Sequence, residues 1–267
     1  MYNEEKRIRH CLERTLEYCI QQSWDFEILV VEDGCSDNSV NIVKEFADYD
    51  NRIILISLPQ RYGKGGSILR AIEYCKKSNI GFIDVDLSAD PSEFERLIPF
   101  IEKYDVVIGS RIIRGNLKEA KRPRTRKFLS NMYHLLFRCL FAINIHDLQC
   151  GFKLFRKDSL SSVLREVKIN GFAFDTEFLV ISKLNGLRIK EVPIVWSHDA
   201  NSKLKLSKTV FNMGKDLLKI WSSVFKAQLY SSNSLRGKFV ARPIILFEVI
   251  SHNPFIKRSI KQNVFTR

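Results

Sequence analysis

Residues 80–91 read IGFIDVDLSADP, an apolar run that ends in two carboxylates one residue apart. This pattern predicts a buried parallel strand with a charged site at its carboxyl end. Successive side chains of a strand point to opposite faces, so Asp84 and Asp86 can serve one ligand only if the chain leaves the sheet between them or just after. Ligands bind at such strand ends in open α/β sheets, and we expect the site there.

The two aspartates suit a hard divalent cation. Mg²⁺ and Mn²⁺ take one or two protein carboxylates beside a substrate phosphate and fill their remaining positions with phosphate and water. The alternative is a loop with acidic helix caps, because Asp90-Pro91 followed by Ser92-Glu93 is a favourable helix start. The ends of the neighbouring strands favour the ligand site.

Strand and helix alternate around this stretch with short connections. Further strands are expected at 26–31, 52–58 and 105–111, and helices at 6–22, 40–47, 67–77 and 92–103. This alternation predicts an α/β fold with a doubly wound, mostly parallel sheet flanked by helices.

Each of these strands ends in residues that could serve a nucleotide. They are Glu32 and Asp33, the glycine turn Gly63-Lys64-Gly65, Asp84 and Asp86, and Ser110-Arg111. The glycine turn is too short for a P-loop and lacks the dinucleotide fingerprint, so by itself it is expected to be a plain loop. Four polar strand ends on one edge indicate a nucleotide site rather than structure alone.

The net charge of +13 stands out in an otherwise ordinary composition of 45% hydrophobic and 27% charged residues. Residues 199–267 contain 13 Lys and Arg against three acidic residues, and a second basic block runs from 111 to 138. Such asymmetry indicates an anionic partner, either nucleic acid or a membrane surface. No nucleic acid is expected, because the sequence has no recognisable binding module and its strand-end carboxylates would repel phosphate without a metal.

The six cysteines are scattered, with no Cys-x-x-Cys pair, which is typical of a reducing compartment. No apolar signal-peptide core is present, and no run approaches the roughly 18 residues that span a bilayer. We therefore expect a cytoplasmic chain, or one that is peripheral on the cytosolic face of a membrane.

The second half departs from the alternation. A basic loop at 114–127 leads into an apolar helix at 128–145, a combination that can lie in a membrane interface with its cations at the headgroups. The alternative is a core helix beneath a solvated loop. With another amphipathic helix expected at 206–225, the predicted organisation is one domain over 1–225 and a basic tail over 226–267.

Several motifs occur together along the chain. In the first half they are YNEE (2–5), VEDGCSD (31–37), GKG (63–65), DVD (84–86) and GSR (109–111), and later DLQCGFK (147–153), FDTE (174–177) and WSHD (196–199). The motifs of the first half resemble those of family 2 glycosyltransferases of the GT-A fold. The later motifs are similar to those of the branch that glycosylates polyprenyl phosphate, most of all dolichyl-phosphate β-glucosyltransferases and next dolichyl-phosphate mannose synthases. The resemblance covers residues 1 to about 220.

The resemblance implies roles for individual residues. Asn3, Glu4, Asp33 and Lys64 would lie at the nucleotide, Asp84 at the ribose or sugar, and Asp86 would hold Mg²⁺ or Mn²⁺ on the diphosphate. Arg111, Arg114 and Lys203 would meet phosphates of the donor or the lipid acceptor, Gln149 would line the sugar pocket, and Asp175 and Glu177 would lie near the reacting centre. For the last two, orientation or sugar binding is favoured over a role as general base, and the segment 114–145 would be the membrane-facing acceptor site.

The implied activity is inverting transfer of a hexose, glucose from UDP-glucose, to polyprenyl or dolichyl phosphate at a membrane surface. The alternatives are a mannose donor, GDP-mannose, a glycan acceptor, or a truncated, non-catalytic nucleotide-sugar-binding protein. The mannose-synthase branch carries a glutamine two residues after the second aspartate. This chain has Ser88 there, which argues against a mannose synthase.

One departure concerns the fold itself. Relatives begin with an apolar strand just before the Tyr2-Asn3-Glu4 motif, whereas this sequence starts at Met1. Because that strand is central to the sheet in the family, we expect a GT-A fold with its first strand missing, a damaged core and a damaged nucleotide pocket. A truncated or misassigned start is the expected explanation.

Overall fold

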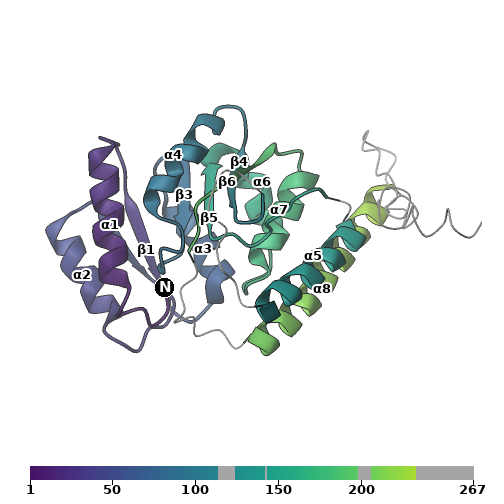
Figure 1. Cartoon of the computed structure of the whole chain (residues 1–267), viewed down its shortest axis with the longest axis horizontal. Helices are drawn as coiled ribbons and strands as arrows, with labels where there is room; N and C mark the ends of the chain where they lie inside the picture. The colour runs from purple at the N-terminus through teal and green to yellow at the C-terminus, as the bar shows by residue number, and fades with distance from the viewer. Residues whose placement is uncertain (114–123, 142, 198–205, 233–267) are drawn as a thin grey trace, which may run out of the picture.

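The computed structural model describes residues 1–113, 124–141, 143–197 and 206–232 (Figure 1). Within these ranges the helices are α1 (Ile8–Gln21), α2 (Ser39–Tyr49), α3 (Gly63–Tyr74), α4 (Phe94–Leu97), α5 (Arg124–Phe141), α6 (Ser161–Glu166), α7 (Phe174–Leu184) and α8 (Leu206–Ser232). The strands are β1 (Ile28–Glu32), β2 (Ile53–Ser57), β3 (Asn79–Ile83), β4 (Val106–Ser110), β5 (Phe152–Arg156) and β6 (Ile189–Pro193). Short 3₁₀ segments lie at Pro91–Glu93, Ile98–Phe100 and Lys157–Leu160.

The strands form two sheets. β1 and β2 are parallel, and the second sheet has the order β3-β5-β4-β6, in which β5 runs antiparallel to both of its neighbours. The predicted α/β class is confirmed, and β5, a strand that the sequence analysis did not predict, is the antiparallel member of the sheet. β5 begins at the carboxyl edge of the sheet, where Gly151 lies against Asp84, and therefore runs back across it.

The sheet is interrupted between β1 and β3, which neighbour each other in Figure 1. Among the described residues the two strands do not pair.

Helices cover both faces of the four-stranded sheet. Phe137 of α5, Phe178 of α7 and Leu217 of α8 are fully buried in the larger core on one face. On the other face, Phe94 of α4 packs on Phe152 of β5 with ring centroids 4.3 Å apart. This packing leaves the strand ends as the accessible edge for a ligand.

The apolar helix expected at 128–145 is α5. It lies beside α8 (Figure 1) and packs on the core through Phe137. Its opposite face leaves Phe128 and Leu135 64% and 62% exposed. It is thus a core helix, as one interpretation predicts, that also carries an exposed apolar stripe.

The glycine turn expected as a loop is instead the start of α3. Gly63 has a φ of +81°, in the left-handed region that favours glycine. A Cβ on Gly65 would lie 2.3 Å from the Cβ of Phe174, so this glycine lets α3 pack directly against the start of α7. Lys64 is thereby fixed on the first turn of a helix.

Three predicted features extend beyond the described ranges. Arg114, Lys203 and the tail over 233–267 lie outside the described residues. α8 continues to Ser232, past the boundary predicted at 225. In the described part of the chain no helix combines the length and apolar character needed to cross a bilayer.

Candidate functional site

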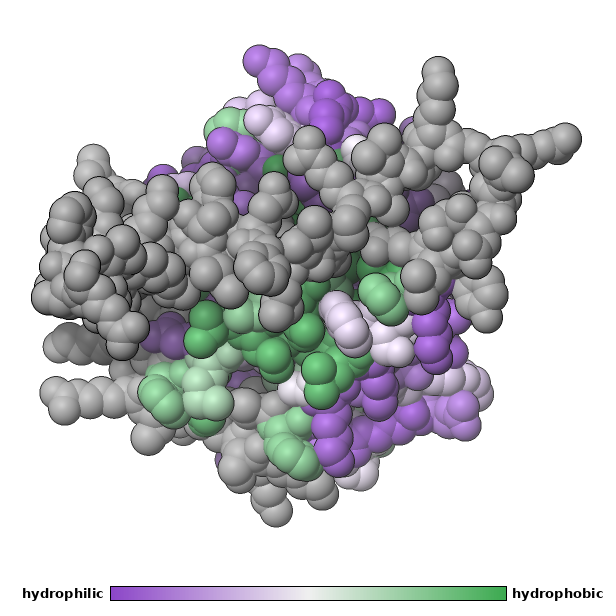
Figure 2. Space-filling model, turned by 90° about the vertical axis from the view of Figure 1, so that its right-hand side faces the viewer, coloured by the Kyte–Doolittle hydropathy of each residue, from purple (hydrophilic) through white to green (hydrophobic). Residues whose placement is uncertain are grey.

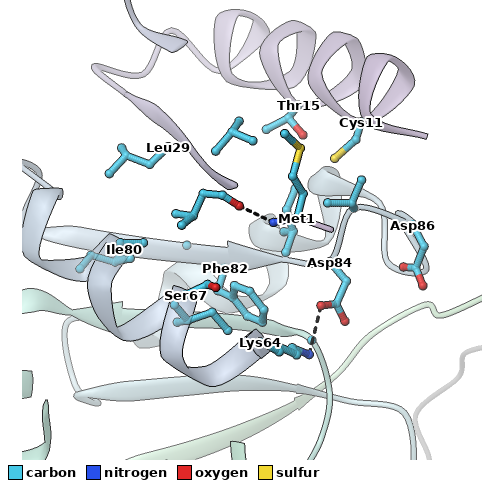
Figure 3. A pocket seen from close by; sticks show the side chains of 18 of the residues that line it. Met1, Cys11, Thr15, Leu29, Lys64, Ser67, Ile80, Phe82, Asp84 and Asp86 are labelled. Atoms are coloured by element: carbon cyan, nitrogen blue, oxygen red, sulfur yellow. Dashed lines mark hydrogen bonds and ion pairs between the residues drawn. The ribbon is translucent and has the colours of Figure 1, made fainter. Parts of the chain in front are cut away.

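A cavity of about 1400 Å³ opens at the carboxyl ends of the strands (Figure 3). It brings together most of the residues that the sequence singles out: Asn3, Glu4, Asp33, Lys64, Asp84, Asp86, Arg111, Gln149 and Asp175. These residues come from segments far apart in the chain. The predicted convergence of the strand ends therefore holds.

The chain turns out of the sheet between Asp84 and Asp86. β3 ends at Ile83, and the amide of Leu87 then donates to the carbonyl of Asp84 at 3.1 Å. Leu87 takes a left-handed φ of +47°, and the amide of Ser88 donates to Asp86 Oδ1 at 3.0 Å. This turn satisfies the condition for two aspartates of one strand end to serve one ligand.

Because residue 151 is glycine, the carboxylate of Asp84 can lie directly against the backbone at that position. A Cβ at position 151 would lie 1.7 Å from Asp84 Oδ2, far inside any allowed contact. Sequence reasoning did not single out Gly151, although it lies within the quoted motif at 147–153. The signal was a glycine just before a strand, which often marks a close approach of another group to the backbone.

Gly151→Ala is expected to lower the activity of this site at least about tenfold while changing the thermal midpoint little, because the added methyl displaces a movable carboxylate rather than backbone. Gly214→Ala is the matched control, since a Cβ at that helical position meets nothing within 4 Å. Kinetics and thermal unfolding of both variants check this. Equal activity of the two would contradict the role given to Gly151.

Four side chains form a row of ion pairs that leads from the aspartate pair into the protein: Asp84, Lys64, Asp175 and Lys153. Lys64 Nζ lies 3.1 Å from Asp84 Oδ1 and 3.5 Å from Asp175 Oδ2, and Lys153 pairs with the other oxygen of Asp175. Asp175 and Lys153 are buried. Lys153, to which sequence reasoning also gave no role, thus holds Asp175 from the side opposite Lys64.

The pKa values of Asp175 and Lys64 are shifted by the opposite charges beside them. Burial raises the pKa of Asp175, but Lys153 and Lys64 outweigh it and hold that pKa below its usual range. Burial likewise lowers the pKa of Lys64, and the charges of Asp175 and Asp84 reverse the shift. Asp175 is therefore a firmly ionised, weak base, which agrees with orientation rather than proton abstraction.

Arg111 is fixed by a carboxylate that sequence reasoning missed. Asp147 is fully buried and accepts hydrogen bonds from the Nε and Nη2 of Arg111 at 2.8 and 2.7 Å, and from its backbone amide at 2.8 Å. The guanidinium also lies 5.4 Å from the ring of Trp196. Burial lowers the pKa of Arg111, but Asp147 outweighs it, so the cation is permanent and rigidly placed.

Asp33 lies in the cavity wall, but its carboxylate serves the fold. Its two oxygens accept the amides of Tyr62 and Gly63 at 2.6 and 2.8 Å, which anchors the start of α3. The geometry therefore gives Asp33 a role in positioning α3, and the implied contact with base or ribose stays a prediction.

Asn3, Glu4 and Gln149 also have partners within the protein. Asn3 Oδ1 accepts the amide of Ser36 at 2.8 Å, and Glu4 pairs with Arg7 at 2.6 Å. Gln149 Nε2 donates to the sulfur of Met213 at 3.6 Å. All three line the cavity, as expected for residues near the nucleotide and the sugar.

The carboxylate of Glu177, which the resemblance implies near the reacting centre, supports a loop and not the cavity wall. Glu177 is absent from the residues that line the cavity, and its carboxylate accepts the amides of Lys168 and Ile169 at 2.9 and 2.6 Å. On α7, Asp175 and Glu177 are two residues apart and so point to different sides of the helix. Burial raises the pKa of Glu177, consistent with a structural carboxylate.

The carboxylates present fit a divalent cation that is shared with a substrate. The described residues contain no cluster of three or more His, Cys, Asp or Glu that could hold a metal by themselves. Asp86 is exposed where it lines the cavity, and Asp84, two residues before it, lines the cavity as well. One or two carboxylates supplemented by phosphate oxygens and water are the usual Mg²⁺ arrangement in nucleotide sites.

The sequence model described as "Glycosyl transferase family 2" matches residues 1–164. This chain belongs to glycosyl transferase family 2. This chain is 32% identical over 224 residues to Glycosyltransferase AglD of Haloferax volcanii, and the alignment covers 82% of this chain. The same match spans only 36% of the length of AglD.

A second relative matches more of its own length. Dolichyl-phosphate beta-glucosyltransferase ALG5C of Trichomonas vaginalis is 32% identical to the family 2 chain over 241 residues, which is 86% of this chain and 71% of that protein.

A solved structure confirms the predicted GT-A fold. Glucosyl-3-phosphoglycerate synthase from Mycobacterium tuberculosis, in complex with Mn²⁺ and UDP-glucose, superposes with a TM-score of 0.60. The match covers 84% of this chain and 76% of the synthase chain, and the two sequences are 16% identical. At this identity the likeness concerns the fold.

Proposed function

We propose that this chain transfers glucose from UDP-glucose to a polyprenyl phosphate, such as dolichyl phosphate, at a membrane surface and with inversion at the anomeric carbon. The observation that carries the proposal is one cavity that holds both an aspartate pair and a fixed arginine and extends to helices with exposed apolar faces. The names of relatives at 32% identity support the donor sugar and the lipid acceptor.

The acceptor needs little activation. A phosphate monoester has a second pKa near 6, so it is largely dianionic at neutral pH and attacks without a strong base. This agrees with the lowered pKa of Asp175, a buried carboxylate whose Oδ2 lies 3.5 Å from Lys64 Nζ. The reaction then depends on bringing an anionic nucleophile to an anionic donor.

The residues of the cavity divide this work. Asp86 is the residue best placed to hold Mg²⁺ or Mn²⁺, which would neutralise the diphosphate and stabilise it as a leaving group. Lys64 fixes Asp84, and Asp147 fixes Arg111, so both charges are oriented before substrate binds. Arg111 is placed to attract a phosphate and hold it in line with the anomeric carbon.

The membrane-facing surface comprises the exposed faces of α5 and α8. Phe128, Met132 and Leu135 of α5 and Phe211, Leu218 and Phe225 of α8 are exposed. Figure 2 faces the side that holds these helices and shows hydrophobic side chains gathered there. Lys215 Nζ lies 4.5 Å from the ring of Phe211, so a cation borders the apolar surface, as on interfacial helices.

The same two helices reach into the cavity. Leu129 and Tyr133 of α5 and Met213 of α8 line it, one or two residues away from exposed apolar positions. A phosphate whose prenyl tail lies in the bilayer could therefore reach the cavity beside these helices. We propose that the chain works as a peripheral protein on the cytosolic face.

The test is transfer of labelled sugar from UDP-glucose, with GDP-mannose in parallel, to polyprenyl phosphate in detergent with and without Mg²⁺ or Mn²⁺. We expect label in the lipid from UDP-glucose, only with metal, and as the β-anomer. Transfer from GDP-mannose and not from UDP-glucose would overturn the assignment of UDP-glucose as the donor. No transfer by the folded protein from either donor would overturn the proposal.

Membrane docking predicts a separate effect. Leu135→Glu combined with Phe211→Glu is expected to lower co-sedimentation with anionic vesicles at least about tenfold, because each buried apolar side chain contributes about 1.5–3 kcal/mol. Tyr49→Glu is the control, since Tyr49 is 91% exposed on α2, away from this surface. Equal sedimentation of the double variant and the control would contradict the assignment.

A further inference from the structure

The short segment that follows β6, residues 194–197, links the end of β4 to the turn that carries the two aspartates. The amide of Ile194 donates to the carbonyl of Ser110 at 3.2 Å, and the amide of Ser197 donates to the carbonyl of Ser88 at 2.7 Å. Ser110 is the last residue of β4, and Ser88 lies in the aspartate turn. We call residues 194–197 the bridging segment, because its backbone is bonded to both charged ends of the site.

A buried carboxylate holds the middle of the bridging segment. Glu93 is 8% exposed, and its Oε2 accepts the amide of Val195 at 3.0 Å. The same oxygen lies 2.9 Å from the Nε of Arg96. Charge-assisted hydrogen bonds are stronger than neutral ones. The bridging segment is therefore held in place on both sides of Trp196 without any substrate.

The bridging segment brings the indole of Trp196 to both charged ends of the site. The guanidinium carbon of Arg111 lies 5.4 Å from the centroid of the indole ring. Trp196 also lines a small hollow together with Asp84, Asp86 and Ser88. In addition it lines the main cavity. One aromatic side chain thus borders the arginine, the aspartate turn and the cavity.

The alternative is that Trp196 is only a core residue. It does pack against the core cluster that contains Phe152, but it stays half-buried and lines two hollows. An aromatic side chain in this position presents a large and rigid apolar surface to a ligand. Ligand sites typically combine such surfaces with a few precisely placed polar groups. The ring faces of a hexose carry C–H groups, so a hexose can pack on an aromatic surface.

The proposed function, on which this inference rests, sets the position of the sugar. In an in-line displacement the anomeric carbon lies between the leaving diphosphate and the attacking phosphate. Asp86 would hold the metal on the diphosphate, and Arg111 would attract the attacking phosphate. The hexose must then lie between these two residues, and Trp196 is the aromatic residue that borders both.

We propose that Trp196 is the surface against which the hexose of the nucleotide sugar packs, and hence the residue that positions the anomeric carbon between the two phosphates. The hydrogen bonds of the bridging segment to Ser88 and Ser110 place the indole before the donor binds. The residues that the resemblance implies at the nucleotide, such as Asn3 and Lys64, belong to other segments. Trp196 therefore contributes to binding of the sugar and not of the nucleotide.

The test compares the affinities of UDP and UDP-glucose, measured by calorimetry with Mn²⁺, in the parent chain and in Trp196→Leu. We expect the variant to bind UDP-glucose about tenfold more weakly and UDP within about twofold of the parent. Trp196→Phe should keep most of the affinity for UDP-glucose, because it keeps an aromatic surface. Trp221→Leu is the matched control, since Trp221 stacks on Phe225 and does not line the cavity.

Tryptophan emission gives a second readout in chains with conservative changes only. The sequence has three tryptophans, Trp24, Trp196 and Trp221. UDP-glucose should change the emission of the parent chain more than UDP does, and Trp196→Phe should abolish that difference. A difference that persists in Trp196→Phe would show that another tryptophan responds to the sugar, and would overturn the proposal.

The other outcomes separate this inference from the proposed function. Affinities for UDP and UDP-glucose that fall equally in Trp196→Leu, or that do not fall at all, would overturn the role of Trp196 and leave the transfer reaction standing. A Phe variant as weak as the Leu variant would contradict the role of an aromatic surface. A parent chain that binds no UDP-glucose would overturn both the proposed function and this inference.

Discussion

Replacing Asp86 by asparagine is expected to lower kcat/KM for sugar transfer about 10³-fold, equivalent to roughly 4 kcal/mol. Asparagine keeps the shape and the hydrogen bond from the amide of Ser88, but it removes the charge that holds a divalent cation. Asp86 is exposed, so the fold should persist and the thermal midpoint should change little. Kinetics at saturating Mn²⁺ and thermal unfolding check both statements.

Asp48→Asn serves as the control for Asp86→Asn. Asp48 is an exposed aspartate on α2, away from the cavity. Its variant should transfer sugar like the parent chain. If the Asp86 variant retained full activity, or needed no more metal than the parent, the assignment of Asp86 as the metal ligand would be wrong.

Replacing Asp147 by asparagine is expected to destabilise the protein by about 3–5 kcal/mol, because it leaves the cation of Arg111 without its buried counter-charge. Transfer should also fall sharply, since the guanidinium loses its bidentate anchor. Chemical unfolding gives the stability, and kinetics at a temperature where the variant is folded give the activity. Asp25→Asn is the control, because it weakens an exposed pair with Lys77 and should cost less than about 1 kcal/mol.

A double variant separates the two roles of this ion pair. Arg111→Met with Asp147→Leu replaces the buried pair by apolar side chains of similar size and should recover much of the lost stability. It should not recover transfer, because no cation is left to position the phosphate. Recovery of both would place the whole effect of Asp147 in folding and remove Arg111 from the proposed mechanism.

Local patterns in the sequence were sufficient to predict the strand ends and the class of site. The apolar run before Asp84 and the acidic and glycine turns after the other strands are such patterns. Each of them depends only on the residues of its own segment. Because parallel strands end at one edge, their polar ends could be placed together without coordinates. The cavity at that edge contains Lys64, Asp84, Asp86 and Arg111, as expected.

Which charges face each other depends on the packing of distant segments. Asp147 and Asp175 are both acidic residues within motifs, yet one anchors Arg111 and the other lies between Lys64 and Lys153. Glu177 is two residues from Asp175 and supports a loop outside the cavity. The partners of Asp147 and Asp175 are distant in sequence and meet only when their segments pack, so no local pattern could pair them.

The reversal of β5 likewise follows from tertiary packing. Alternating strands and helices predict parallel neighbours, but β5 enters at the carboxyl edge, where Gly151 makes room for Asp84. The break between the two sheets could likewise be seen only in three dimensions, because strand pairing is a property of two edges and not of one segment.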